Sequence, residues 1–422
     1  MLMGIAQLPE GRDYWSTDGI LHNDYVARRF SRNRFEKLSR YLHLSDPNAA
    51  DHTDKLYKVR PQITSFGENF LQNFIPGAQL SVDEAMIQYD GRLGWKQYMP
   101  KKPIKWGIKL WCLCDSLTGY CSAFDVYTGR NTDRSGAGLG YDVVTKLTQH
   151  FFGTNRHVYA DNFFSSVRLI ENLLQNGTFY CGTVRQNSKG LPKQVTNAKL
   201  AKGKKRQMVN PHGILVCKWK DKRDVMMIAS NSNGGDVVKT RTKNKTEVHH
   251  VPNMIVMYNK YMGGVDHNDQ FRAYYNVGRS GKKWWKYVMW GLLNIATVNA
   301  HILHSLSHMP LPSDKRKYSM KSFKLAVVHQ LVDNFCGRKR SFSGTSIGTQ
   351  IVGILQPDIL PGHSIVRLDG RKKACRACSM KARRTPSGRC VETHYACSLC
   401  QVYLCKKGAC FQEFHGLLNH EH

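Results

Sequence analysis

The sequence predicts a mixed α/β fold, with further helices and a cysteine-rich segment at its edges. Three strand-like stretches follow one another after Pro76-Gly77, and helical and strand-like stretches then alternate as far as residue 187. The chain has 422 residues, enough for about two or three cooperative units. Hydrophobic residues make up 41% of it, so most of the chain is expected to fold.

The first helical stretch runs from Asn23 to about Phe74. Within YVARRFSRNRFEKLSRYLHL, apolar residues recur near one face of a predicted helix: Val26, Phe30, Phe35, Leu38 and Leu42. We therefore interpret residues 1–78 as the first part of a helical domain.

The central elements come next. AQLSVDEAMIQYDG, IKLWCLCD and GYCSAFDVYTG are predicted strands, the last two joined by a turn at Ser116 to Gly119. YDVVTKLTQHFF is a predicted helix, HVYAD a strand, SSVRLIENLLQNG a helix with a glycine C-cap, and TFYCGTVR a strand. This order of strands and helices is the one expected of an RNase H-like fold.

The second half of the chain is more heterogeneous. Residues 188–250 are basic and include the strand-like GILVCKW and VMMIAS, which indicate an inserted β-rich module. Residues 251–275 return to the core, 276–340 contain a long predicted helix and SFKLAVVHQLVDNF, 341–371 read as a linker, and 372–422 are rich in cysteine.

Positive charge is spread along the whole chain. Lys and Arg total 62 against 31 Asp and Glu, a formal net charge of +31. Because neutralising phosphates releases counterions from nucleic acid, such a chain is expected to bind DNA or RNA. A ribosomal or membrane-surface protein would carry the same excess, but the basic residues here form no single amphipathic membrane helix.

No apolar stretch is predicted to enter a membrane. The opening MLMGIAQLPEGRDYW has no basic leader and is not expected to be a signal peptide. The most apolar stretch, Trp284 to Leu306, should be a helix buried in protein, because four polar residues in it would be costly in lipid: Asn294, Asn299, His301 and His304.

Three aspartates suit a two-metal site that cleaves phosphodiesters. Asp83 lies in SVDEAMIQYD, a strand with apolar residues on both faces, where a carboxylate is unusual. Asp161 ends the strand-like HVYA, and Asp266 follows Gly-Gly-Val ahead of a helix. Two Mg²⁺ ions about 3.5 to 4 Å apart need such hard oxygen ligands. Taken alone, Asp161 also suits a helix cap and Asp266 a helix-start acid, so both interpretations stay open.

The sequence blocks around these aspartates resemble those of the piggyBac transposase family. SVDEAMIQYDGR, YMPKKPIKWGIKLW, YADNFFSS and YMGGVDHNDQ follow in this order, and the resemblance runs from Asp13 to the C-terminal cysteines. It implies a DDE/D-type RNase H-like core, an insertion domain, and a helical dimerisation and DNA-binding domain formed by residues 1–78 and 276–340. Asp83, Asp161 and Asp266 fall on the family's catalytic positions for Mg²⁺ or Mn²⁺, and Asp269 matches a further acidic position.

The same resemblance implies an activity. Family members nick transposon ends, let the freed 3′ hydroxyl form a hairpin, reopen it and join the ends to TTAA sites without a covalent enzyme intermediate. For this chain it implies double-stranded DNA as partner, both transposon ends and target, together with a homodimer and a nuclear location.

Two basic stretches with aromatic residues are predicted to contact DNA. WKQYMPKKPIKWGIK alternates lysines with Trp95, Tyr98 and Trp106, which suits a phosphate-binding groove with stacking surfaces, or alternatively a solvated hairpin with lysine edges. In GRSGKKWWKY, Trp284 and Trp285 suit the core equally well. The predicted DNA contacts are Arg92, Lys101, Lys102, Lys105, Lys109, Arg279, Lys282 and Lys283.

Seven of the 13 cysteines lie between Cys375 and Cys410, where two CxxC pairs predict structural zinc. The ligand set indicates two Zn²⁺ ions in a cross-braced module that folds only with metal. The resemblance implies that it binds transposon-end DNA, and a RING- or PHD-like protein-binding module is the alternative. Seven ligands are predicted, with Cys390 or His394 as the eighth and His420 as a further candidate: Cys375, Cys378, Cys397, Cys400, Cys405, Cys410 and His415.

Two hypotheses about function follow. Family members usually begin with an acidic leader and further dimerisation helices, whereas Met1 enters near the end of one such helix. The chain is therefore expected to be a fragment or a shortened host copy. The intact aspartates favour an active transposase, and the shortened start favours a domesticated DNA-binding or chromatin protein.

Overall fold

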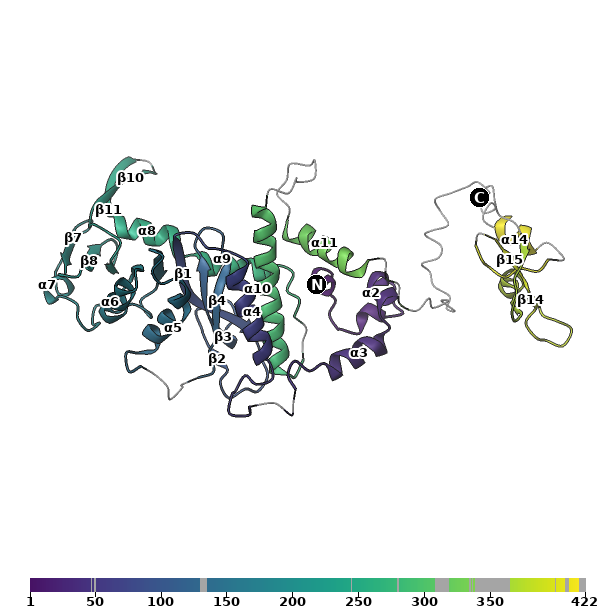
Figure 1. Cartoon of the computed structure of the whole chain (residues 1–422). Helices are drawn as coiled ribbons and strands as arrows, with labels where there is room; N and C mark the ends of the chain where they lie inside the picture. Colours follow the sequence, from purple (N-terminus) through teal and green to yellow (C-terminus); the bar gives the residue numbers. More distant parts are fainter. Residues whose placement is uncertain are drawn as a thin grey trace. The chain divides into compact units, whose positions relative to one another are not determined.

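The computed structural model describes residues 1–46, 48, 51–129, 135–243, 245–278, 281–307, 319–333, 335, 337, 365–398, 400–406 and 410–416. The chain forms two compact units (Figure 1). The large unit comprises Met1–Trp15 and Asn23–Arg338, and the small unit comprises Ser16–His22 and Lys339–His422. The aspartates belong to the large unit and the clustered cysteines to the small one.

A mixed sheet forms the centre of the large unit. Its strand order is β2-β3-β1-β5-β6-β9-β8-β7, and β4 also pairs with β3. β1 is antiparallel to β3 and parallel to β5, which is parallel to β6. The strands are β1 (Gln79–Gln88), β2 (Gln97–Tyr98), β3 (Trp106–Asp115), β4 (Cys121–Val126), β5 (His157–Ala160), β6 (Phe179–Thr183), β7 (Lys205–Val209), β8 (Leu215–Lys220) and β9 (Asp224–Ala229).

Strands from the stretch predicted to be an insertion extend this same sheet. β9 pairs with β6 in antiparallel fashion, and β8 and β7 follow it outward. A separate hairpin, β10 (Asp236–Lys243) and β11 (Lys245–Pro252), then leads into α8 (Asn253–Tyr261).

Helices cover both faces of the sheet, and β1 lies between them. On one face Leu169 of α6 packs in a buried cluster with Val82. On the other face Leu292 of α10 packs with Ile87. The expectation that both faces of this strand are covered is confirmed. The helices of the large unit are α1 (Leu2–Ile5), η1 (Asp13–Trp15), α2 (Asp24–Arg29), α3 (Arg32–Tyr41), α4 (Arg60–Gln72), α5 (Leu139–Thr148), η2 (Gln149–Phe151), α6 (Val167–Gln175), α7 (Lys193–Thr196), α8, α9 (Gly264–Ala273), α10 (Trp284–Leu306) and α11 (Met320–Val332).

Local signals explain the ends of α6. The Ser166 side chain accepts a hydrogen bond from the Leu169 N–H at 3.2 Å and caps the first turn. After the C-cap Asn176, Gly177 has a φ of +60°, which suits glycine. The predicted glycine cap is therefore confirmed.

The first helical stretch differs from the expectation of one continuous apolar face. Phe30 and Ser31 have extended backbone, and Ser31 Oγ accepts a hydrogen bond from the Arg34 N–H at 3.4 Å, which starts a new helix, α3. Leu38 and Leu42 are 54% and 37% exposed. The predicted face is therefore broken by a serine cap and only partly buried.

The most apolar stretch of the sequence is the long helix α10, which packs against the sheet (Figure 1). Its buried Asn299 donates to the Cys121 carbonyl and accepts from the Cys121 N–H, both at 2.9 Å. These bonds satisfy a polar side chain inside the protein, and the predicted burial of this helix is confirmed. No helix in the described part of the chain is both long and apolar enough to cross a membrane.

The small unit has short strands and a core rich in cysteine. β12 (Ile365–Arg367) pairs with β15 (Tyr395–Cys397), and β13 (Lys373–Ala374) pairs with β14 (Glu392–Thr393). Two helices, α13 (Arg376–Met380) and α14 (Cys410–Gly416), complete its described part. Its buried cluster consists of Cys375, Ala377, Cys378, Cys397, Leu404 and Cys410.

Candidate active site and cysteine-rich metal centre

The sheet brings two of the predicted catalytic aspartates together. β1 and β5 run parallel with Val82 opposite Ala160, so Asp83 and Asp161 are the next residues on neighbouring strands. Burial raises the pKa of Asp161; the hydrogen bond from the Phe163 N–H opposes this rise, and the charge of Asp83 adds to it. The two carboxylates therefore interact electrostatically.

The third aspartate comes from α9, which begins directly against the sheet. A Cβ on Gly264 would lie 2.4 Å from Ser81 Oγ and 2.8 Å from the Asp115 carbonyl oxygen, so the close approach requires glycine. Asp266 follows two residues later with its side chain 61% exposed. The glycine thus places an accessible carboxylate next to β1.

A lysine ammonium lies among the aspartates. Lys102 Nζ is 3.1 Å from Asp83 Oδ2 and 3.8 Å from Asp266 Oδ1, and it donates to the Glu84 carbonyl at 3.0 Å. Its charge also lowers the pKa of Asp161. Burial alone would lower the pKa of Lys102, but Asp83 and Glu84 raise it above its ordinary value. One cation thus interacts with all three predicted catalytic carboxylates.

The carboxylates do not themselves form a metal-sized group in this arrangement. Among the described residues, the groups of three or more Asp, Glu, His or Cys ligand atoms within 4.8 Å of one another are both made from the C-terminal cysteines and His415. The group that contacts both Asp83 and Asp266 in this arrangement is the ammonium of Lys102.

Two further acids lie beside the site. Asp269, predicted as a further acidic position, forms an ion pair with the buried Arg272; burial raises its pKa and Arg272 opposes the rise. Glu84, which the sequence reasoning did not single out, is half-buried; burial and then the charge of Asp83 raise its pKa to about 7. Its sequence signal is a second acid directly after Asp83 in an apolar strand.

The predicted DNA contacts fall into two groups. Lys102 and Lys109 are half-buried beside the carboxylates, and burial lowers the pKa of Lys109 although Glu84 and Asp83 oppose this. Arg279 lies outside the described residues. The other predicted contacts are exposed: Arg92, Lys101, Lys105, Lys282 and Lys283.

The aromatic residues of the two basic stretches are also divided. Trp95 and Trp285 are buried in the core, and Trp95 packs edge-on against Trp284 at 5.3 Å between ring centroids. The proposed stacking role is therefore wrong for Trp95. Tyr98 and Trp106 are exposed, and their ring centroids lie 4.5 Å apart.

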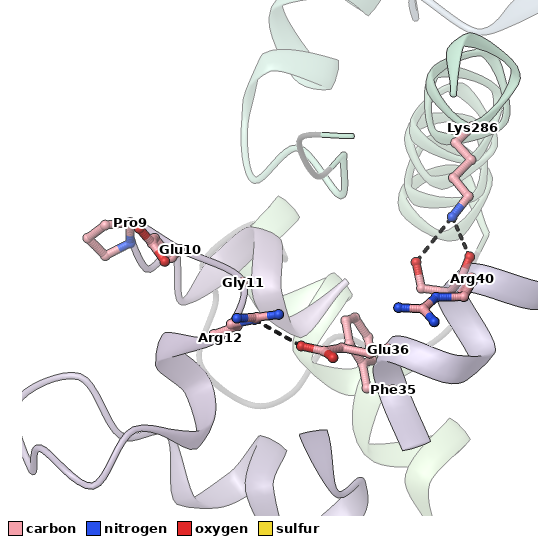
Figure 2. A pocket seen from close by; sticks show the side chains of 9 residues that line it. Pro9, Glu10, Gly11, Arg12, Phe35, Glu36, Arg40 and Lys286 are labelled. Atoms are coloured by element: carbon pink, nitrogen blue, oxygen red, sulfur yellow. Dashed lines mark hydrogen bonds and ion pairs between the residues drawn. The ribbon is translucent and has the colours of Figure 1, made fainter. Parts of the chain in front are cut away.

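A separate pocket of about 610 Å³ lies between the N-terminal segment, α3 and the start of α10 (Figure 2). An ion pair of 3.1 Å joins Arg12 to Glu36 at its wall, and Lys286 donates to Ser39 Oγ at 3.1 Å. None of the aspartates discussed above lines it. It is a polar hollow on the helical part of the large unit.

The C-terminal cysteines form two groups, each with its ligand atoms within 4.8 Å of one another. In the first, Cys378 Sγ lies 3.5 Å from Cys410 Sγ and 3.9 Å from Cys405 Sγ. In the second, Cys400 Sγ lies 3.7 Å from His415 Nε2. The first group contains Cys375, Cys378, Cys405 and Cys410, and the second contains Cys397, Cys400 and His415.

The two groups interleave along the sequence, which is the cross-braced arrangement expected. One group offers four thiolates and the other two thiolates and an imidazole, and both ligand sets suit Zn²⁺. The Cys405 N–H donates to Cys375 Sγ at 3.3 Å, and such bonds help lower the pKa of Cys375 against the effect of burial. Cys390 and His394 belong to neither group, and Cys390 is exposed beside Arg384. His420 lies outside the described residues.

Comparison with known proteins decides the family. Residues 1–301 match the family model described as Transposase IS4. Human PiggyBac transposable element-derived protein 3 is 30% identical over 98% of this chain and 68% of its own length. The chain belongs to the piggyBac transposase family.

Other matches agree with this membership of the piggyBac family. Human PiggyBac transposable element-derived protein 2 is 32% identical over 72% of the chain, which spans about half of that relative, 54%. A solved structure of a piggyBac transposase synaptic complex with hairpin DNA aligns with a TM-score of 0.70 at 26% identity, covering 96% of this chain and 84% of that one. Residues 360–416 match a model described as DDE_Tnp_1-like zinc finger, so the C-terminal unit is a zinc-finger domain.

Proposed function

We propose that this piggyBac-family chain is a DNA transposase of the DDE/D type with an RNase H-like core. It would cleave transposon ends and join them to TTAA target DNA through hairpin intermediates. The observation that carries the proposal is that Asp83, Asp161 and Asp266, from three separate segments, all interact with the ammonium of Lys102.

The three aspartates would hold two Mg²⁺ or Mn²⁺ ions. Carboxylate oxygens are the hard ligands that these ions prefer, and the donor chemistry here fits them. The position of Lys102 supports the fit, because a cation already lies against the same carboxylates. When bound, the ions would stabilise the attacking and leaving oxygens of the phosphoryl transfer.

The protein's own residues fix the geometry of the reaction. Asp83 is held within β1, Asp161 at the end of β5, and Asp266 at the start of α9. In cleavage, a water oxygen attacks phosphorus, the bond to the 3′ oxygen breaks, and that oxygen leaves as a hydroxyl after taking a proton. The 3′ hydroxyl then gives up its proton and attacks a phosphorus of the opposite strand; the bond from that phosphorus to its own 3′ oxygen breaks, this oxygen leaves as a hydroxyl after taking a proton, and the hairpin is closed.

Exposed basic residues support double-stranded DNA as the partner. Arg92, Lys101 and Lys105 lie on the segment that also carries Lys102, and Lys282 and Lys283 precede α10. The related solved structure is a complex with hairpin DNA. We propose that this chain binds transposon ends and target as a homodimer in the nucleus. Its affinity should fall steeply with salt, since each neutralised phosphate releases counterions.

The C-terminal domain is proposed to bind two Zn²⁺ ions and to contact DNA at the transposon end. Each ion would take one of the two ligand groups. Basic side chains of this domain pair with an acid within it: Arg383 Nη2 lies 2.8 Å and Lys381 Nζ 3.3 Å from Glu413 Oε1. A protein-binding module of the RING or PHD kind remains the alternative use of the same scaffold.

The test uses the full chain and a duplex taken from the DNA that flanks its coding sequence. With Mg²⁺ or Mn²⁺ the protein should nick the duplex, and Asp161→Asn should abolish nicking while binding persists. Asp221→Asn, an exposed acid between β8 and β9, is the matched control and should nick normally. Calorimetric titration should show that Asp161→Asn binds Mn²⁺ more weakly than the wild type, whereas the control Asp221→Asn should bind it as the wild type does. If the wild type nicks the duplex with neither metal, the proposed transposase activity is refuted.

A second function has one observation in its favour. The human relatives are named transposable element-derived proteins. If this chain is a domesticated DNA-binding protein, it should bind duplex DNA with a steep salt dependence but leave it uncut. The nicking assay above separates the two functions.

A further inference from the structure

Phe163 is a large apolar side chain that lies on the surface beside the aspartates. It follows Asp161 by two residues, and its N–H donates to Asp161 Oδ1 at 2.9 Å, which fixes the backbone there. Phe163 is 38% exposed, whereas its neighbour Phe164 is only 1% exposed and belongs to the core. One ring of the pair fills the interior and the other remains accessible to solvent.

The exposed ring is held in place by a second aromatic residue. Phe163 is stacked on Trp111, with ring centroids 5.3 Å apart and planes 18° apart. Trp111 is 1% exposed and anchored in β3 directly opposite Glu84 of β1, the residue after Asp83. Phe164 packs edge-on against Phe163 at 5.1 Å. This support makes the accessible ring a rigid surface next to the carboxylates.

A cation accompanies the stacked rings. Lys109 Nζ lies 3.8 Å from the Trp111 ring centroid and 5.3 Å from that of Phe163. An aromatic face next to a lysine offers stacking for a nucleobase and charge for a phosphate, which is how proteins hold unpaired nucleotides.

We propose that Phe163, supported by Trp111 and accompanied by Lys109, is a stacking platform for one unpaired nucleobase of the DNA strand at the aspartates. The proposal rests on the proposed function, because it places the reacting strand at Asp161. A paired base inside a duplex has neighbours on both faces and cannot use the ring, whereas a base freed at a strand end or a hairpin turn can. The platform would therefore favour DNA with unpaired bases next to the reacting phosphate.

The test compares two DNA probes with the same full-length protein, without added divalent metal. One probe is a fully paired duplex, and the other is the same duplex with a short 3′ overhang that carries 2-aminopurine. The wild type should bind the overhang probe about tenfold more tightly, and its 2-aminopurine fluorescence should be quenched by stacking. Phe163→Leu should lose the preference and the quenching, and Phe163→Trp should keep both.

Phe152→Leu is the matched control. Phe152 is also partly exposed, but it precedes β5, whereas Asp161 follows that strand. The control should keep the overhang preference. The platform is overturned if Phe163→Leu, folded as judged by its thermal unfolding, binds and quenches the overhang probe like the wild type.

The two proposals fail separately. A wild type that never nicks DNA but prefers the overhang in a Phe163-dependent way would support the platform and refute the transposase activity. A wild type that nicks DNA while Phe163→Leu retains the preference would refute the platform alone.

Discussion

Replacing Gly264 by alanine should push α9, and with it Asp266, away from the sheet. The added Cβ would meet Ser81 Oγ at 2.4 Å, the Asp115 carbonyl oxygen at 2.8 Å and Ser116 Cα at 3.0 Å. Real Cβ atoms do not approach other heavy atoms so closely, so the helix or the turn after β3 must move.

The loss of stability caused by Gly264→Ala depends on whether the atoms that the new Cβ meets can move. Ser81 is fully buried, and the turn is fixed by backbone hydrogen bonds from Ser116 to Gln79 at 3.0 Å and from Asp115 to Tyr120 at 2.9 Å. Overpacking at such a site costs about 2 to 3 kcal/mol, the upper part of the usual range. Alanine gains at most about 1 kcal/mol over glycine in a helix. The cost of overpacking exceeds the gain in helix propensity, so the free energy of unfolding should fall by about 1 to 2 kcal/mol.

Urea unfolding followed by tryptophan fluorescence measures this change, and Gly263→Ala is the control. A Cβ on Gly263 would meet no other heavy atom within 4 Å, and its φ of −88° suits alanine. The control should therefore be as stable as the wild type or slightly more stable. Wild-type stability in Gly264→Ala, or an equal loss in Gly263→Ala, would refute the reasoning about close approach. Where Gly264→Ala folds, nicking should also fall because Asp266 is displaced.

Three further predictions concern the site, the zinc domain and a helix cap. Because the pKa of Glu84 is raised from 4.5 to about 7, the stability that this group contributes is present below pH 4.5 and is lost as pH rises through 7. In urea unfolding without added metal, Glu84→Gln should thus gain stability relative to the wild type as the pH rises from 5 to 8. A difference in free energy of unfolding between the two proteins that does not change with pH would contradict the interpretation of Glu84 as a buried acid. Cys378→Ser should lose zinc by elemental analysis and expose residues 365–416 to protease, whereas Cys390→Ser should do neither; zinc loss in both variants would show that the ligand groups are wrong. Ser166→Ala should lower the free energy of unfolding by about 1 kcal/mol while Ser166→Thr retains the cap, and a neutral Ser166→Ala would mean that the bond to the Leu169 N–H contributes nothing.

Local patterns predicted the elements of the large unit but not all of their pairing. The strand β1 and the helices α6 and α10 were predictable because alternation, capping residues and apolar periodicity are local in sequence. Nothing local specifies that β9 pairs with β6 and so extends the sheet by three strands, because a strand's partner depends on contacts far along the chain. The break before α3 comes from the Ser31 cap, whose hydrogen bond from the Arg34 N–H starts a new helix inside an otherwise continuous apolar pattern.

The candidate site, like the fold, is only partly predictable from the sequence. The order of the sequence blocks around Asp83, Asp161 and Asp266 indicates these residues, and strand register and helix placement explain how all three come to lie around Lys102. The sequence predicts Lys102 as a DNA contact, because it belongs to a stretch in which lysines alternate with aromatic residues. Its place among carboxylates depends on the fold of the whole segment. Glu84 was missed because a raised pKa depends on three-dimensional burial, which one strand's pattern does not reveal.

The charges of this site act in the opposite sense to those of the whole chain. The chain carries a formal net charge of +31, which attracts DNA. At the aspartates, three carboxylates face the two ammonium groups of Lys102 and Lys109, and burial together with the charge of Asp83 raises the pKa of Glu84 to about 7. This local excess of carboxylate charge is only partly neutralised by Lys102. It still favours divalent cations over a phosphate alone. Under the proposed function, DNA would approach through the exposed basic residues near the site, and divalent cations held by Asp83, Asp161 and Asp266 would supply the positive charge that its phosphate needs there.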